Sequence, residues 1–105
     1  MSSRVDPRQI RILVNEKGGP AYEVTPTGTE VNVGRVSGND VVLRDGTISK
    51  RQCRFVFEDG KVLVQDLKSS CGTYLDGRKV DVAVVGEGSV VSVGDFELRV
   101  ISRDR

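Results

Sequence analysis

The chain has 105 residues, which is enough for one domain and short for two. A domain of this length buries roughly 65% of its unfolded surface and folds without a metal or disulfide staple. The composition, 37% apolar and 30% charged, is that of a soluble globular protein, and a net charge of +1 disfavours sequence-blind binding to a nucleic acid backbone.

Several missing features narrow the function further. Histidine is absent, which excludes Ser-His and Cys-His catalysis, so we expect a protein that is not an enzyme and holds no metal or cofactor. Cys53 and Cys71 have no metal-binding spacing and are expected to be one core thiol and one loop thiol. The sequence contains neither a run of about 18 apolar residues nor the apolar segment of a signal peptide. We therefore expect no membrane contact and a cytoplasmic location, or a nuclear one in a eukaryote.

Period-two alternation of apolar residues predicts short strands along most of the chain. In chain order the runs are IRILVNE (10–16), AYEVTP (21–26), EVNVGR (30–35), DVVLRD (40–45), CRFVFED (53–59), KVLVQDL (61–67), a hairpin in GTYLDGRKV (72–80) and two strands in SVVSVGDFELRVI (89–101). Many short antiparallel strands bounded by glycine and polar residues predict an all-β sandwich or barrel. Residues 9–102 form this domain, and 1–8 and 103–105 are expected to be flexible ends.

Three of the connecting loops carry unusual polar residues. The first loop is GRVSGND (34–40), the second is RDGTISKRQ (44–52) and the third is DLKSSCGT (66–73). Together they supply a guanidinium, an ammonium, hydroxyls and glycine-exposed backbone N–H groups, which are the donors that a phosphate dianion needs. Because binding residues usually sit in loops at the ends of a sandwich, the pattern indicates an anion site.

The stretch from Val31 to Val80 resembles the forkhead-associated (FHA) domain family. That family's pattern runs Gly-Arg, Asn/Asp-aliphatic-x-Leu, Ser-x-x-His and Asp-Leu-x-Ser-x-Asn-Gly-Thr, and the closing run GEGSVVSVGDFELRV fits it too. The resemblance implies an eleven-stranded twisted sandwich of two sheets with the recognition loops at one end. It also implies that the domain binds phosphothreonine peptides after a Ser/Thr kinase has acted, with the phosphothreonine in another protein or in the same chain.

The resemblance also implies roles for individual residues. Arg35 matches the arginine that contacts the phosphate, and Ser49 matches the serine whose hydroxyl donates to it. Lys50 lies where the family often has a further phosphate donor, and Ser70 matches a Ser/Thr position that lines the phosphothreonine pocket. Arg51, the neighbouring cation, completes the expected phosphopeptide-binding surface.

Four further positions are expected to shape or modify the pocket. Gly34 and Gly72 match the glycines that shape the first and third loops. The family's loop-bracing histidine is Gln52 here, and glutamine keeps one donor and one acceptor. The family's asparagine, which holds the main chain of the ligand, is Cys71, whose thiol is a weak donor. The phosphate contacts are thus expected to be intact and the main-chain contact weakened.

Three alternatives remain open. A degenerate FHA domain would bind a partner without phosphate, as the changes at Gln52 and Cys71 allow. A cysteine enzyme would use Cys71 beside Gly72 and Lys68, although no histidine base exists. A nucleic acid-binding barrel would use exposed cations, but the chain has only five aromatic residues and the phenylalanines alternate as core residues do.

Overall fold

The computed structural model describes residues 10–25 and 28–102, so that the flexible ends expected at 1–8 and 103–105 lie outside the described residues. The described part of the chain contains eleven β-strands and no helix. The strands are β1 (Ile10–Glu16), β2 (Ala21–Val24), β3 (Glu30–Gly34), β4 (Val41–Val42), β5 (Cys53–Glu58), β6 (Lys61–Asp66), β7 (Tyr74–Leu75), β8 (Arg78–Lys79), β9 (Val82–Val84), β10 (Val90–Val93) and β11 (Phe96–Ser102).

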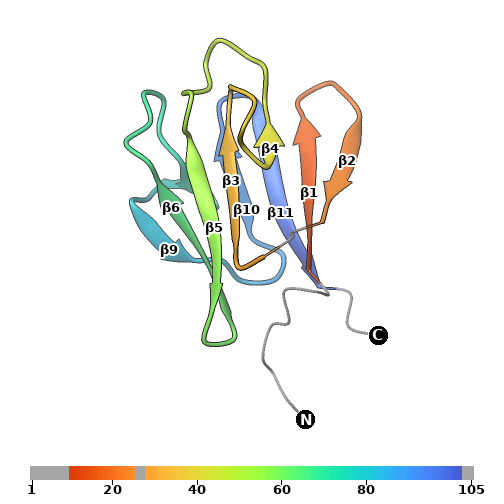
Figure 1. Cartoon of the computed structure of the whole chain (residues 1–105), viewed down its shortest axis with the longest axis vertical. Helices are drawn as coiled ribbons and strands as arrows, with labels where there is room; N and C mark the ends of the chain where they lie inside the picture. The colour runs from red at the N-terminus through yellow and green to blue at the C-terminus, as the bar shows by residue number, and fades with distance from the viewer. Residues whose placement is uncertain (1–9, 26–27, 103–105) are drawn as a thin grey trace.

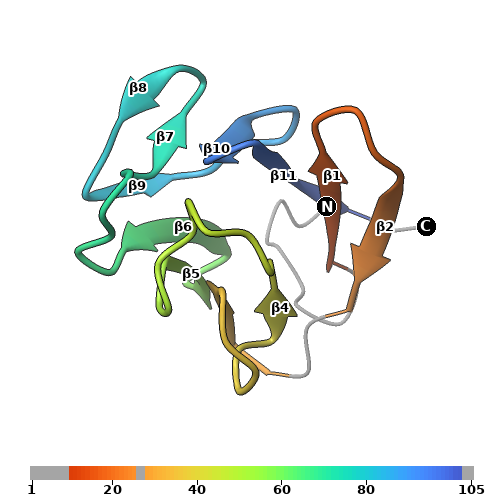
Figure 2. The same ribbon diagram turned by 90° about the horizontal axis from the view of Figure 1, so that it is seen from above.

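The strands form two sheets that face each other (Figure 2). One sheet has six strands in the order β2-β1-β11-β10-β7-β8, and the other has five in the order β4-β3-β5-β6-β9. The predicted eleven-stranded sandwich of two sheets is therefore confirmed. In the described ranges no helix is long and apolar enough to cross a membrane.

The core lies between the sheets and follows from the period-two pattern. Along β5 the residues alternate between buried and half-buried, with Cys53, Phe55 and Phe57 turned inward. The facing sheet contributes inward residues in the same way, among them Val91 and Leu98, both of which are fully buried. Alternate side chains of a strand point to opposite faces, so one apolar stripe per strand is enough to fill the space between two sheets.

The hairpin predicted around Asp76-Gly77 is confirmed. β7 and β8 pair with Leu75 opposite Arg78, which leaves a two-residue turn. Asp76 and Gly77 have φ angles of 50° and 86°. Positive φ at both central residues matches the twist of the flanking strands, and glycine adopts it without strain.

Two features of the sheets differ from the sequence prediction. β3 and β4 pair in parallel, with Val33 opposite Val41, where antiparallel neighbours were expected. The chain makes a complete loop between these strands and re-enters in the same direction, held there by Asp40. Alternation also did not reveal β9, because Val82 and Val84 are exposed and Ala83 is half-buried, so its apolar residues do not fall on an inward stripe.

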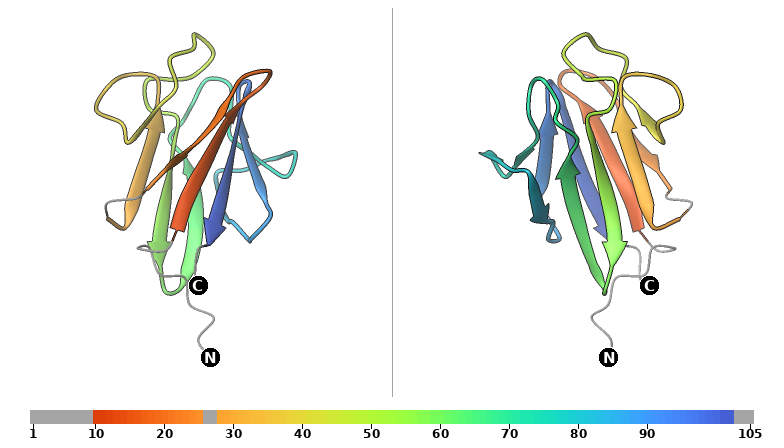
Figure 3. Two further views of the ribbon diagram at one scale, coloured as in Figure 1. Left: turned by 90° about the vertical axis from the view of Figure 1, so that its right-hand side faces the viewer. Right: turned by 60° about the vertical axis from the view of Figure 1, so that its left-hand side comes forward.

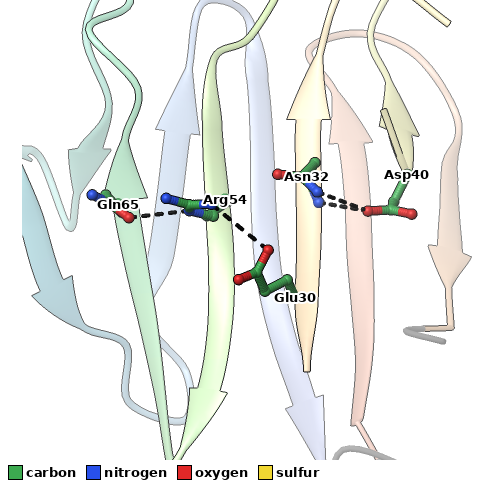
Figure 4. A network of polar contacts seen from close by, with 5 residues as sticks. All are labelled: Glu30, Asn32, Asp40, Arg54 and Gln65. Carbon is green, nitrogen blue, oxygen red and sulfur yellow. Dashed lines mark hydrogen bonds and ion pairs between the residues drawn. The ribbon is translucent and has the colours of Figure 1, made fainter. Parts of the chain in front are cut away.

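A polar ladder on the outer face of the five-stranded sheet holds the start of this re-entrant loop (Figure 4). The backbone N–H of Asn32 donates to the Asp40 carboxylate at 2.7 Å, and the Asp40 N–H donates back to the Asn32 carbonyl at 2.8 Å. On the neighbouring strands Arg54 donates to Gln65 and pairs with Glu30 at 3.6 Å. The reciprocal bonds of Asp40 fix where the first loop leaves and rejoins the sheet.

The first, second and third loops, which connect β3–β4, β4–β5 and β6–β7, emerge from the same end of the sandwich (Figure 1). The β5–β6 turn lies at the opposite end, as both further views also show (Figure 3). The two sheets thus bring the three polar loops together, although their residues are up to 39 positions apart in the sequence.

Candidate functional site

The first loop is tied to the second through Arg35. The backbone N–H of Arg35 donates to the Ser49 carbonyl at 3.0 Å, and its Nε donates to the Ile48 carbonyl at 2.9 Å. Arg35 is half-buried. Its two Nη groups bond to no other described residue, so the fixed guanidinium keeps its terminal donors for a ligand.

The second loop is anchored by one apolar residue and one tight turn. Ile48 is 1% exposed and packs into the core, which holds the middle of an otherwise polar loop against the sandwich. Before it, the Asp45 carboxylate accepts hydrogen bonds from the hydroxyl and the backbone N–H of Thr47. Those two bonds, the hydroxyl first, lower the pKa of the Asp45 carboxyl. The turn and the anchor together set the direction in which Ser49 leaves the core.

Gln52 joins the second loop to the third. Its side chain is fully buried, with Oε1 accepting from the Ser49 N–H at 3.0 Å and Nε2 donating to the Gly72 carbonyl at 2.9 Å. Nε2 also lies 3.4 Å from the Thr73 hydroxyl. A buried amide that lost these partners would be strongly unfavourable, so these bonds favour a single arrangement of the two loops.

A second bond between these loops involves the Ser49 hydroxyl. The Ser70 backbone N–H donates to Ser49 Oγ at 2.8 Å. This bond uses a lone pair of the Ser49 oxygen. The hydroxyl hydrogen is not involved and remains available to donate to a bound anion. Ser70 itself is exposed at the rim of the third loop. Arg35, Ser49 and Ser70 are thereby connected by hydrogen bonds at one end of the molecule.

The third loop is held by Asp66, a residue that the sequence analysis did not single out. Its carboxylate accepts hydrogen bonds from the hydroxyls of Ser69 and Thr73, and Ser69 Oγ in turn accepts from the Gly72 N–H at 3.1 Å. The Ser69 backbone N–H also donates to the Asp66 carboxylate, at 3.1 Å. An aspartate at a strand end followed three residues later by serine is a turn signal that could have identified this network.

The hydrogen bonds of Asp66 also decide its protonation. Burial would raise the pKa of the Asp66 carboxyl, but the bonds from Ser69, Thr73 and the Lys68 backbone outweigh burial and lower the pKa. The carboxylate is therefore charged at neutral pH and keeps accepting all of these bonds.

Close packing explains why glycine ends β3. A Cβ built on Gly34 would lie 2.1 Å from the Lys50 carbonyl oxygen and 2.6 Å from Asn39 Nδ2. The Asn39 amide donates to that same Lys50 carbonyl at 3.0 Å and to the Val36 carbonyl at 2.8 Å. Any larger residue at position 34 would push the first and second loops apart. Asn39 is a second positioning residue that the sequence analysis did not identify.

The remaining expected residues lie at the margin of this arrangement. Lys50 and Arg51 are exposed, and their side chains form no hydrogen bond or ion pair with another described residue, so no such bond joins them to Arg35, Ser49 and Ser70. Cys71 is half-buried, and its Sγ lies 3.8 Å from Gln52 Oε1 and 3.7 Å from the Gly72 carbonyl. The expected core thiol is Cys53, and burial raises its pKa to about 12.

Comparison with known proteins identifies relatives over most of the chain. The sequence profile of the FHA domain matches residues 31–94. The glycogen accumulation regulator GarA of Mycolicibacterium smegmatis is 39% identical over 67 residues, which cover 64% of this chain and 42% of GarA. The FHA domain-containing protein At4g14490 of Arabidopsis thaliana is 35% identical over 91 residues, covering 80% of this chain and 23% of that protein. The chain thus spans less than half the length of these two relatives.

A solved structure shares the fold over the whole chain. The solution structure of an FHA domain from a hypothetical protein of Arabidopsis thaliana aligns with a TM-score of 0.80 and 27% identity. The alignment covers 100% of this chain and 94% of that one. The two-sheet architecture described above is therefore that of an FHA domain.

Replacement of Gln52 by alanine should destabilise the domain by about 2–4 kcal/mol, because it leaves the Ser49 N–H and the Gly72 carbonyl without partners. Urea unfolding measures this loss. The control is Gln65→Ala. Gln65 is half-buried on the outer face of the five-stranded sheet, and its replacement should change the free energy of unfolding by less than about 1 kcal/mol. Equal losses in the two variants would show that Gln52 does not fasten the loops.

The lowered pKa of Asp66 predicts a loss of stability in acid. A carboxyl whose pKa is lower in the folded state contributes stability that is fully present above its unfolded pKa of about 3.9 and is lost as the pH falls through the folded value. Urea unfolding between pH 7 and pH 2.5 should therefore show a steeper decline below about pH 4 for the wild type than for Asp66→Asn. Identical pH profiles would contradict the assignment.

Proposed function

The chain belongs to the forkhead-associated family, and from this premise we propose that its three-loop end binds phosphothreonine peptides and so recruits or regulates a partner after a Ser/Thr kinase has acted. FHA domains are phosphopeptide-binding modules. The proposal extends that activity to the residues that this chain places at its loop end.

The observation that carries the proposal is the connection of Arg35, Ser49 and Ser70. The Arg35 guanidinium is fixed by the Ile48 carbonyl, and the Ser49 hydroxyl is fixed by the Ser70 N–H. These two donors belong to the first and second loops, the Ser70 N–H ties the third loop to them, and all are held in place before any ligand arrives. Binding to donors that are already positioned loses less conformational entropy than binding to mobile loops.

A phosphate group is the ligand whose chemistry fits these donors. It carries nearly two negative charges at neutral pH and three strong acceptor oxygens. Arg35 supplies charge-assisted hydrogen bonds, and the Ser49 hydroxyl supplies a further donor. Lys50 and Arg51 follow Ser49 in the sequence and are exposed, so their side chains add favourable charge without a fixed geometry. The threonine hydroxyl without phosphate offers neither the charge nor the acceptors, so binding depends on the kinase.

Because of Cys71, we expect this domain to bind the main chain of its ligand differently from other members of the family. A thiol cannot form the pair of hydrogen bonds that an asparagine side chain makes to a ligand's main chain. Gly34, Gln52 and Gly72 keep the three loops in position, so we expect the phosphate contacts to be retained and the main-chain contacts to be weaker. A phosphate-independent interaction is the alternative that this substitution favours.

The proposal assigns recognition to this domain and no chemical reaction. Its partner is a phosphothreonine-containing protein, or a phosphothreonine elsewhere in the chain that carries this domain. Because protein kinases need ATP, the proposed location is the cytoplasm, or the nucleus in a eukaryotic cell.

Replacement of Arg35 by glutamine should weaken phosphopeptide binding at least about 100-fold, because two charge-assisted bonds of about 1.5–3 kcal/mol each are lost. The ligand is the tightest peptide from an oriented phosphothreonine library, measured by fluorescence anisotropy against its unphosphorylated twin. Arg99→Gln on β11, where the arginine pairs with Glu97, should change the affinity less than twofold. Equal affinity of the wild type for both peptides would support the phosphate-independent alternative.

Replacement of Cys71 by asparagine should tighten phosphopeptide binding about tenfold, since one or two neutral hydrogen bonds to the ligand's main chain are restored. Cys71→Ala is the matched control and should not bind more tightly than the wild type. The same anisotropy titration measures both. Weaker binding by the asparagine variant would mean that position 71 does not face the ligand.

A further inference from the structure

A hollow of about 450 Å³ lies between the first and second loops. It is lined by Arg35, Val36, Ser37, Arg44, Asp45 and Gly46. Neither Ser49 of the second loop nor any residue of the third loop belongs to this lining. The hollow therefore shares Arg35 with the proposed phosphate site and is bordered by no residue of the third loop.

Two arginines from different loops border the hollow. Arg35 is held by its Nε, and its two Nη groups bond to no other described residue. Arg44 is exposed, and its side chain bonds to no other described residue. A planar guanidinium without a protein partner favours a carboxylate or phosphate, which it can bind through two parallel hydrogen bonds.

One acid, Asp45, also borders the hollow, and one oxygen of its carboxylate is already engaged. Asp45 Oδ1 accepts from the Thr47 N–H at 2.8 Å and from the Thr47 hydroxyl at 2.6 Å. Asp45 therefore serves its own turn and is not paired with either arginine. With two cations and one anion in its lining, the hollow keeps a net positive charge.

The charge of the surrounding surface has the same sign. Residues 34–52 and 66–73, which comprise the three loops and β4, hold five of the 16 basic residues and three of the 15 acidic ones. This end therefore has a small excess of positive charge, whereas the chain as a whole carries only +1. A cleft of one charge concentrates ligands of the opposite charge, which makes an acidic ligand segment the occupant that this surface favours.

We propose that this hollow is a second anion subsite, which takes an acidic side chain of the ligand on one side of the phosphothreonine. The inference rests on the proposed function, because Arg35 is shared between the phosphate and the hollow. The ligand class is then narrower than phosphothreonine peptides in general. It is phosphothreonine with aspartate or glutamate on the side that runs past Arg44, and an acid on the opposite side does not reach the hollow.

The test uses three degenerate phosphothreonine peptide pools. One acidic pool has Asp/Glu at the three positions before the phosphothreonine, and the other has Asp/Glu at the three positions after it. The neutral pool has Asn/Gln at all six positions. The wild type should bind one acidic pool about three- to fivefold more tightly than the neutral pool, as expected for an exposed ion pair. Arg44→Gln should remove that preference and leave the affinity for the neutral pool unchanged. Arg78→Gln, which removes an exposed arginine outside the hollow, should keep the preference.

The outcomes separate the two proposals. If the wild type binds the phosphorylated neutral pool and its unphosphorylated counterpart alike, the proposed function fails, and the subsite fails with it. If phosphorylation is required but Arg44→Gln leaves the preferences for both acidic pools unchanged, or reduces both equally, the subsite is wrong and the proposed function stands.

Discussion

The arrangement of the loops at the three-loop end of this domain depends on one buried amide. Gln52 places one acceptor and one donor inside the protein, and both must be satisfied there because water is excluded. They are satisfied by the Ser49 N–H of one loop and the Gly72 carbonyl of another. The requirement to bury no unpaired polar atom therefore becomes a geometric constraint on two loops that are distant in sequence.

The sandwich and the loops contribute different things to function. The apolar core supplies stability, and its two sheets deliver three connections to one end (Figure 1). Local devices then remove the freedom that these connections would otherwise have. Ile48 anchors the second loop in the core, Gly34 permits close contact with the Lys50 carbonyl, and Asp66 organises the third loop. The proposed anion donors therefore have little conformational entropy left to lose on binding.

Much of the fold could be predicted because strands with one buried face leave a period-two pattern, as in Cys53–Glu58. β9 left no such pattern, and the parallel β3–β4 pair depends on hydrogen bonds of Asp40 that alternation does not encode. At the candidate site, Arg35 and Ser49 were predicted from a motif. The positioning roles of Asn39 and Asp66 were not, because polar residues in turns look alike until the structure shows which backbone groups they satisfy.

The most direct test of the central claim is a nuclear magnetic resonance titration of the ¹⁵N-labelled domain with a phosphothreonine peptide and its unphosphorylated twin. If the loops linked by Gln52 form one pocket, the phosphorylated peptide will shift the backbone amide signals of Arg35, Ser49 and Ser70 together, and the twin at equal concentration will not. Shifts centred on the β5–β6 turn at the opposite end, or the same shifts with both peptides, would contradict the claim.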